Sequence, residues 1–137
     1  MNTTLIVSII LALAPAFGIE PKVALAVASV ESSLNPKAIG QAGEIGLFQI
    51  MPDIGKKMGY TKKQLKDPVI NTYVGLQLLK EAKANCKHKV GLTYLVCYNY
   101  GIKNAMRVKH PTKFPYVKRV KKQLDKKPIC NNVLLGK

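Results

Sequence analysis

The chain has 137 residues, 47% of them apolar, which is long enough to bury the core of one domain and too apolar for a disordered chain. Its net charge is +15, from 22 Lys and Arg against 7 Asp and Glu. Residues 1–70 carry 7 basic and 5 acidic residues, whereas residues 71–137 carry 15 and 2. Such a basic half suits nucleic acid, an anionic membrane surface or an acidic cell wall, unless it is only a solvated lysine-rich surface.

The N-terminal segment is uncharged over its first 19 residues. Residues 5–14 resemble the apolar region of a secretory signal, and Ala14-Pro15-Ala16 resembles a cleavage site, but no Lys or Arg precedes them. A membrane anchor needs about 20 apolar residues, and Pro15 would weaken it. The alternative is that residues 5–17 form the buried first helix of the domain. We expect the active protein to retain this segment, because cleavage after Ala16 would expose the apolar face that it covers.

The next elements are a helix, a loop and a short apolar run. Pro21 suits the first turn of a helix, whose apolar residues recur through Asn35 before Pro36 disfavours continuation. Three glycines make residues 36–46 a loop. Residues 47–51 are either a short strand or a buried extended segment. The apolar positions of the helix are Val23, Val27, Val30 and Leu34.

The rest of the chain is predicted to be helical with short connections. Asp53 is expected to cap a short helix that ends by Gly59, and Asp67-Pro68 to open a longer one. Residues 92–100 form a further helix that closes at Gly101, and residues 116–124 form a final basic helix. The fold class is therefore mainly α, in one domain. Residues expected on the inner face of the longer helix are Val69, Tyr73, Leu76 and Leu79.

The sequence predicts no metal site and leaves the disulfide pairing open. Its cysteines are Cys86, Cys97 and Cys130, which allow one disulfide with three choices of pair. No Cys-x-x-Cys is present, and His88 and His110 stand apart from any ligand spacing. We expect no cofactor.

Glu31 is the carboxylate with a chemical interpretation. It lies at the edge of the apolar stripe and in the last helical turn, at the negative end of the helix dipole. Burial and the dipole both favour the neutral carboxyl and raise its pKa. A carboxyl that is protonated near neutral pH can act as a general acid in glycosidic cleavage. The alternative is an ordinary residue that borders the core and reaches water.

Five segments, in order, resemble the lysozyme-like lytic transglycosylases of the soluble lytic transglycosylase (SLT) family. The longest is 31-ESSLNPKAIGQAGEIGLFQIMP-52. It has a Glu-Ser pair, then Asn-Pro, and then a Gly-rich loop that leads into 46-GLFQIMP-52, which resembles the family's G-L-M-Q-I-M-P with Phe48 for the Met. The others are 18-GIEP-21, 67-DPVINTYVGLQLL-79, 97-CYNYG-101 and 116-YVKRV-120. This resemblance covers about residues 10–120 and implies a single helical domain of the goose-type lysozyme kind. A small loop or short-strand region would follow the catalytic helix.

The resemblance assigns a role to six residues. Glu31 matches the single catalytic acid and base, and Tyr98 matches a tyrosine whose hydroxyl hydrogen-bonds that carboxyl. Substrate-binding positions match Gln49, Phe48, Asn99 and Ser32. Gly40 stands where serine is common and Glu44 where a small residue is common, which leaves the sugar subsites undefined.

The implied reaction is non-hydrolytic cleavage of the MurNAc–GlcNAc β-1,4 bond of peptidoglycan, giving a 1,6-anhydro-MurNAc end. One alternative is a hydrolytic muramidase, for which Glu44 is the available second carboxylate. The other is a non-enzymatic, cationic wall-binding module. The expected organisation is an apolar segment over residues 1–17, a catalytic domain over 18–124 and a basic tail over 125–137.

The resemblance also sets expectations about partners and location. The expected partner is the peptidoglycan glycan strand, together with a secretion, conjugation or phage assembly, and no specific nucleic acid. The expected state is a monomer in the periplasm or cell envelope, or associated with a phage.

Overall fold

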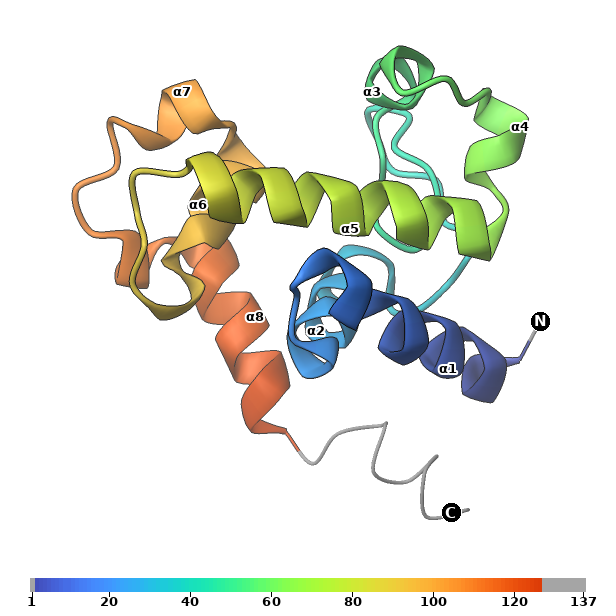
Figure 1. Ribbon diagram of the computed structural model, residues 1–137, viewed down its shortest axis with the longest axis horizontal. Helices are drawn as coiled ribbons and strands as arrows, with labels where there is room; N and C mark the ends of the chain where they lie inside the picture. The colour runs from blue at the N-terminus through green and yellow to red at the C-terminus, as the bar shows by residue number, and fades with distance from the viewer. Residues whose placement is uncertain (1, 127–137) are drawn as a thin grey trace.

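The structure is a computed structural model that describes residues 2–126. Cys130 and all but the first two residues of the predicted basic tail lie outside the described residues. Helices account for nearly all the regular structure in this part of the chain (Figure 1), which confirms the mainly α fold class. The α-helices are α1 Thr3–Leu13, α2 Pro21–Ser32, α3 Pro52–Lys57, α4 Lys62–Leu65, α5 Pro68–Asn85, α6 Leu95–Tyr100, α7 Ile102–Ala105 and α8 Pro115–Asp125. Short 3-10 helices are η1 Ala14–Phe17, η2 Gly91–Tyr94 and η3 Pro111–Lys113.

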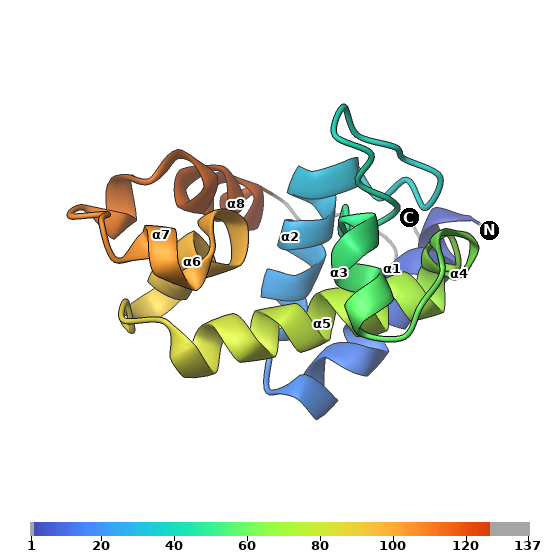
Figure 2. The same cartoon turned by 90° about the horizontal axis from the view of Figure 1, so that it is seen from above.

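The long helix α5 spans the molecule and joins its two ends. One end holds α3, α4 and the preceding loop, and the other holds α6, α7 and α8 (Figures 1 and 2). Helix α2 lies between these ends in Figure 2 and packs on both α1 and α8. The C-terminal turn of α2 is therefore placed where the two ends of the molecule face each other.

The apolar N-terminal segment is a helix of this domain. Asn2 caps α1 by accepting a hydrogen bond from the backbone N–H of Leu5 at 2.9 Å. Ile6, Val7 and Ile10 are buried on the side of α1 that packs on α2 and α5. This is the packing that the first-helix interpretation required. No helix within residues 2–126 is long and apolar enough to cross a membrane.

Helix α2 begins at Pro21 as predicted but ends earlier than Asn35. Its last helical residue is Ser32, and the next two residues adopt left-handed backbone angles, with φ of 53° at Ser33 and 61° at Leu34. This turn brings Leu34 back into the core, where 6% of its surface is exposed. The predicted apolar stripe was therefore right in composition, but its last member reaches the core through a turn.

The segment after α2 differs from both alternatives given for residues 47–51. Leu47, Phe48 and Ile50 are buried, but Leu47 and Phe48 lie in a turn and Ile50 in an isolated bridge, so no strand forms. Isolated bridges join Ile45 to Ile39 and to Ile50. The small region after α2, expected to be a loop or short strands, is thus a compact loop.

Two helix starts near this loop were misread. Pro52 is the first residue of α3, so Asp53 lies inside its first turn, and Met51 takes the cap position. Helix α4 was missed; Thr61 and Gln64 form a reciprocal capping box at its start. With only four residues, α4 offers too few apolar positions for a periodic signal.

Helix α5 starts as predicted, and its expected inner face is confirmed in part, because Leu76 and Leu79 are fully buried. Asp67 caps it by accepting hydrogen bonds from Val69 and Ile70. Val69 and Tyr73, expected inside, are 47% and 44% exposed. The buried face instead includes Asn71 and polar or small neighbours, because the loop after α2 packs against them.

The C-terminal end of the fold follows the predicted elements closely. Gly101 ends α6 with a φ of 89°, and α8 covers residues 115–125 against the predicted 116–124. The short helix α7 was not predicted. Cys86, at the C-terminal cap of α5, and Cys97, in α6, form a disulfide, which is one of the three pairings left open.

Candidate active site

Glu31 lies in a cleft between the two ends of the molecule. It belongs to the last turn of α2, and its carboxyl is partly buried. The cleft has a volume of about 310 Å³. Both ends contribute to its lining, which consists of Glu31, Ala42, Glu44, Phe48, Gln49, Ile50, Met51, Ile54, Leu78, Tyr98 and Asn99. Five of the six predicted site residues are therefore brought together around one cleft.

The hydroxyl that contacts the acid comes from Tyr116 of α8. Tyr116 donates a hydrogen bond of 2.8 Å to Glu31 Oε2 and is 2% exposed. The resemblance had matched Tyr98 to this bond, but in the structure the donor is Tyr116. Tyr98 is a partly buried neighbour whose ring centroid lies 6.3 Å from that of Tyr116. Packing of α8 on α2 brings the two bonded residues together across 85 positions of sequence.

The surroundings of Glu31 raise the pKa of its carboxyl above the ordinary value. The largest cause is burial, which penalises the charged form, and the charge of Glu44 adds a smaller contribution in the same direction. The hydrogen bond from Tyr116 and the charge of Arg119 act in the opposite direction and lower the pKa. Arg119 also lies over the Tyr116 ring, 5.6 Å from its centroid. The direction agrees with a carboxyl that can donate its proton.

The loop that faces Glu31 is held by the buried side chain of Asn71. Its amide donates to the carbonyls of Ile45 and Leu65, each at 2.8 Å. Its carbonyl oxygen accepts from the backbone N–H of Phe48 at 2.8 Å. Asn71 thus connects the start of α5 to the loop and to the end of α4. Asn71 lies in the quoted motif of residues 67–79, but no role was predicted for it.

Two glycines allow this close approach. A side chain at Gly75 would collide with the ring of Phe48, and one at Gly46 would collide with the Asn71 amide. Phe48 is consequently packed on α5 and only 1% exposed. It lines the cleft but offers little surface to a sugar ring, although the resemblance matched it to a substrate-binding position.

Gln49 and Ser32 stabilise the loop through backbone carbonyls. Gln49 has a φ of 49°, and its side-chain amide donates to Gly46 at 3.0 Å and to Ala38 at 3.2 Å. Ser32 donates to Leu47 at 2.8 Å and to Ala28 at 3.0 Å. Gln49 also lines the cleft, whereas Ser32 is outside the set of lining residues. Ser32 therefore joins α2 to the loop.

Glu44 places a second carboxyl in the same cleft. Its Oε1 accepts a hydrogen bond from the backbone N–H of Ala42 at 2.7 Å. The carboxyl fills the space beside Gly40: a Cβ built there would lie 2.5 Å from Glu44 Oε2. The two departures from the family pattern are therefore one arrangement, in which the missing side chain at position 40 makes room for the carboxyl.

Other parts of the described chain offer less chemistry. A larger hollow of about 520 Å³ lies between Pro52 and Lys62, but its one carboxyl, Asp53, is exposed. Within residues 2–126 no three His, Cys, Asp or Glu side chains gather in a way that could hold a metal ion. The chemistry that the cleft can perform is therefore proton transfer by a partly buried carboxyl.

The arrangement of this fold is shared with known proteins. The helical fold with an acid at the end of its second helix defines a lysozyme-like domain. It superposes on the lytic transglycosylase Slt of Pseudomonas aeruginosa, solved as an inactive mutant, with a TM-score of 0.62 and 21% identity over 72% of this chain and 17% of that one. The profile of the transglycosylase SLT domain matches residues 8–120, and the chain belongs to that family.

Curated relatives come from a phage and from bacteria. A transglycosylase of Enterobacteria phage PRD1 is 37% identical over 47% of this chain and 24% of its own length. An endo-type membrane-bound lytic murein transglycosylase A of Klebsiella pneumoniae is 29% identical over 62% and 48%. A membrane-bound lytic murein transglycosylase C of Actinobacillus succinogenes is 33% identical over 67% and 30%. The chain thus spans less than half the length of each.

Proposed function

We propose that this protein is a peptidoglycan lytic transglycosylase with Glu31 as its acid and base. The observation that carries the proposal is the partly buried carboxyl of Glu31 at the cleft between the two ends, which accepts a hydrogen bond from the Tyr116 hydroxyl at 2.8 Å. Its pKa is raised by burial, as a proton donor near neutral pH requires. Family membership and the names of the relatives support the same reaction.

The reaction needs one carboxyl acting twice. Protonated Glu31 gives its proton to the oxygen of the MurNAc–GlcNAc β-1,4 bond, and that bond breaks to leave an oxocarbenium-like MurNAc. The Glu31 carboxylate then takes the proton of the C6 hydroxyl, whose oxygen bonds to C1 and closes the 1,6-anhydro ring. Tyr116 stabilises the carboxylate between the two steps by donating to Oε2. The enzyme ends the cycle protonated, as it began.

The other cleft residues position the glycan in this proposal. Gln49 and Asn99 lie on opposite walls of the cleft and contact the sugar. Tyr98 packs beside Tyr116 and limits its movement. Phe48 lines the cleft, and Ser32 fixes the loop to the catalytic helix.

The relatives also suggest a location. One is a phage protein and others are called membrane-bound murein enzymes, so we place this chain at the cell envelope or with a phage that crosses it. We further propose that the protein is exported to the periplasm with residues 1–17 retained. There it would act together with a secretion, conjugation or phage assembly.

A hydrolytic muramidase is the second candidate, and Glu44 is the observation that favours it. Its carboxyl lines the same cleft as Glu31, where it can orient a water molecule toward the sugar. The products of the two reactions differ in composition, because an anhydro end is lighter by one water than a hydrolysed end.

Mass spectrometry of digested peptidoglycan tests both candidates. We expect anhydro ends from the wild type and from Glu44→Gln, and no products from Glu31→Gln. Hydrolysed ends that disappear in Glu44→Gln would establish the muramidase. Cleavage by a folded Glu31→Gln variant would exclude Glu31 as the acid.

A further inference from the structure

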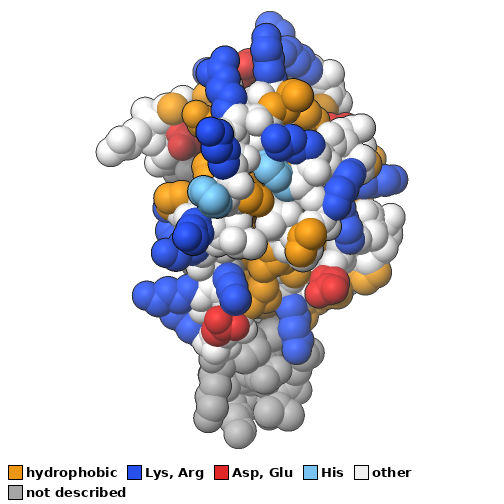
Figure 3. Space-filling view, turned by 90° about the vertical axis from the view of Figure 1, so that its left-hand side faces the viewer, with side chains coloured by type: hydrophobic (Ala, Val, Ile, Leu, Met, Phe, Trp, Pro, Cys, Tyr) orange, Lys and Arg blue, Asp and Glu red, His pale blue; other side chains and the backbone are white. Residues whose placement is uncertain are grey.

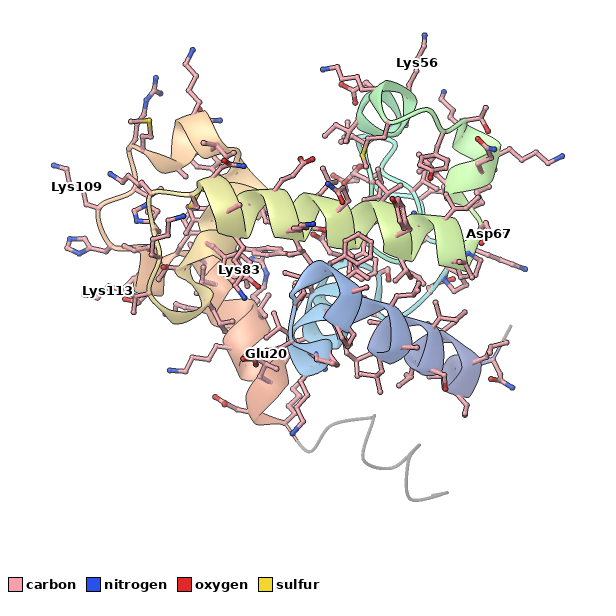
Figure 4. The ribbon with its side chains drawn as sticks, in the orientation of Figure 1. Glu20, Lys56, Asp67, Lys83, Lys109 and Lys113 are labelled. Carbon is pink, nitrogen blue, oxygen red and sulfur yellow. A yellow bond between two sulfur atoms is a disulfide. The ribbon has the colours of Figure 1, made fainter. Side chains whose placement is uncertain are left out.

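The end of the molecule that holds α7 is basic in a way that the cleft chemistry does not use. Residues 82–124 contain no Asp or Glu. Figure 3 shows Lys and Arg side chains distributed over this face with apolar side chains between them. Figure 4 places Lys109 and Lys113 at this end, away from Lys56 and Asp67. The basic residues of the stretch are Lys83, Lys87, Lys89, Lys103, Arg107, Lys109, Lys113, Lys118, Arg119, Lys121 and Lys122.

The same end exposes large apolar side chains. Val90 is 78% exposed and Met106 is 62% exposed, the two highest values among the large apolar residues that lie at the surface. Tyr100 and Ile102, at the same end, are 47% and 45% exposed, whereas Ile39, on the loop after α2, is 58% exposed. Singly scattered apolar residues are common on protein surfaces, but exposed apolar residues that gather at one end among charged side chains indicate an interaction surface.

Hydrogen bonds join the loop that carries Val90 to α7 and Met106. The Lys87 ammonium donates to the carbonyl of Met106 at 2.9 Å, and His88 Nε2 lies 2.9 Å from the carbonyl oxygen of Ala105. The loop before η2 is therefore fixed against α7. The disulfide between Cys86 and Cys97 ties that loop to α6. We call the surface formed by Val90, Met106, Lys103, Arg107, Lys109 and Lys113 the α7 surface.

We propose that the α7 surface docks on a lipid bilayer that contains anionic lipids. Its lysines and arginines meet the phosphate groups, and Val90 and Met106 enter the boundary between headgroups and acyl chains. A soluble polyanion would satisfy the charges but would gain nothing from Val90 and Met106, which is why the apolar pair selects a bilayer. This binding lies outside the proposed reaction at Glu31 and does not depend on it.

Vesicle binding without peptidoglycan tests the proposal. The full chain is sedimented with vesicles of phosphatidylglycerol and phosphatidylethanolamine, and separately with phosphatidylcholine alone. We expect binding to the anionic vesicles only. Replacing Lys109 and Lys113 by Gln should weaken it roughly tenfold to thirtyfold, since each surface cation contributes about a fivefold change in affinity. Val90→Ser with Met106→Ser should weaken it several-fold without changing the charge.

Matched variants at the opposite end provide the control. Lys56→Gln with Lys57→Gln removes the same charge, and Leu5→Ser with Val69→Ser removes comparable exposed apolar surface. Both pairs should leave vesicle binding unchanged. Equal losses in these controls would show a diffuse charge effect and overturn the proposal. Binding to inorganic polyphosphate as strong as to vesicles, unaffected by the Val90 and Met106 changes, would replace the bilayer by a soluble polyanion. Absence of binding to anionic vesicles would reject the proposal directly, whatever the outcome of the peptidoglycan assay.

Discussion

At the scale of single residues, the proton of Glu31 is controlled by neighbours that act in opposite directions. Burial and Glu44 raise its pKa, whereas Tyr116 and Arg119 lower it. A general acid is active while protonated, so activity falls as the pH rises through its pKa. The position of the alkaline limb of the pH–rate profile, measured in a variant of each neighbour, therefore shows how that neighbour changes the pKa of Glu31.

Tyr116→Phe should slow the reaction and move this limb to higher pH. The change removes the hydrogen bond that lowers the pKa of Glu31 and stabilises the carboxylate formed after proton transfer. Hydrogen bonds to charged groups contribute about 1.5–3 kcal/mol, which corresponds to a loss of roughly tenfold to hundredfold in kcat. Tyr98→Phe is the matched control and should change kcat much less. A larger effect at Tyr98 would return the supporting role to that residue.

Charge removal should shift the same limb in two directions. Arg119→Gln removes a charge that lowers the pKa of Glu31, so the limb moves to higher pH. Glu44→Gln removes a charge that raises it, so the limb moves to lower pH. Both shifts should shrink as salt screens the charges. Two shifts of the same sign would contradict this electrostatic account.

Two buried threonines differ in one hydrogen bond and should respond oppositely to substitution. Thr72 is fully buried, and its hydroxyl has no hydrogen-bond partner within residues 2–126, whereas the Thr93 hydroxyl donates to the carbonyl of Val90 at 2.7 Å. Thr72→Val should raise the free energy of unfolding by about 1 kcal/mol, because it removes an unpaired buried hydroxyl. Thr93→Val should lower it by a similar amount. Denaturant titration measures both, and destabilisation by Thr72→Val would indicate a partner such as a bound water.

At the scale of elements, the loop facing Glu31 has its position set by α5. Asn71→Ala would leave the Phe48 amide and the carbonyls of Ile45 and Leu65 without this partner. We expect a loss of about 2–4 kcal/mol in the free energy of unfolding. Asn85→Ala, on the exposed end of the same helix, should cost under about 1 kcal/mol and serves as control. Similar losses would mean that the loop holds its place without Asn71.

The boundaries of elements were predictable where turn and cap residues act locally. Two helix starts were predicted correctly, at Pro21 and at the Asp67-Pro68 pair, and so was the C-terminal end of α6 at Gly101. The inner face of α5 was predictable at Leu76 and Leu79 but not at Asn71, which is buried by partners from the loop and from α4. Periodicity counts apolar residues and cannot anticipate a buried amide with three hydrogen bonds.

The site was predictable in composition and less so in its contacts. The quoted motifs contained Glu31, Gln49, Asn99 and Tyr116, and the structure brings all four to the cleft or its wall. Which tyrosine hydroxyl reaches the acid depends on how α8 packs on α2, a long-range contact that no local pattern encodes.

At the scale of the whole molecule, one covalent bond joins the long central helix to the end that carries the α7 surface. The Cys86–Cys97 disulfide closes a short loop, with a sequence separation of 11. Replacing both cysteines by alanine should lower the free energy of unfolding by about 2–3 kcal/mol. A thiol reductant should lower the Tm of the wild type and leave that of the double variant unchanged. A reductant effect in the double variant would point to Cys130.

The space shared by Gly40 and Glu44 has an evolutionary consequence. Because a side chain at position 40 would displace the Glu44 carboxyl, substitutions at the two positions are epistatic. Gly40→Ser in the present background would push a mobile charge away from its Ala42 anchor, whereas the same change after Glu44→Ala would enter a vacant space. Evolution from glycine at position 40 to serine should therefore be easier when Glu44 is replaced first. In the reverse order, the intermediate with Gly40→Ser and an unchanged Glu44 would have a displaced carboxylate beside Glu31.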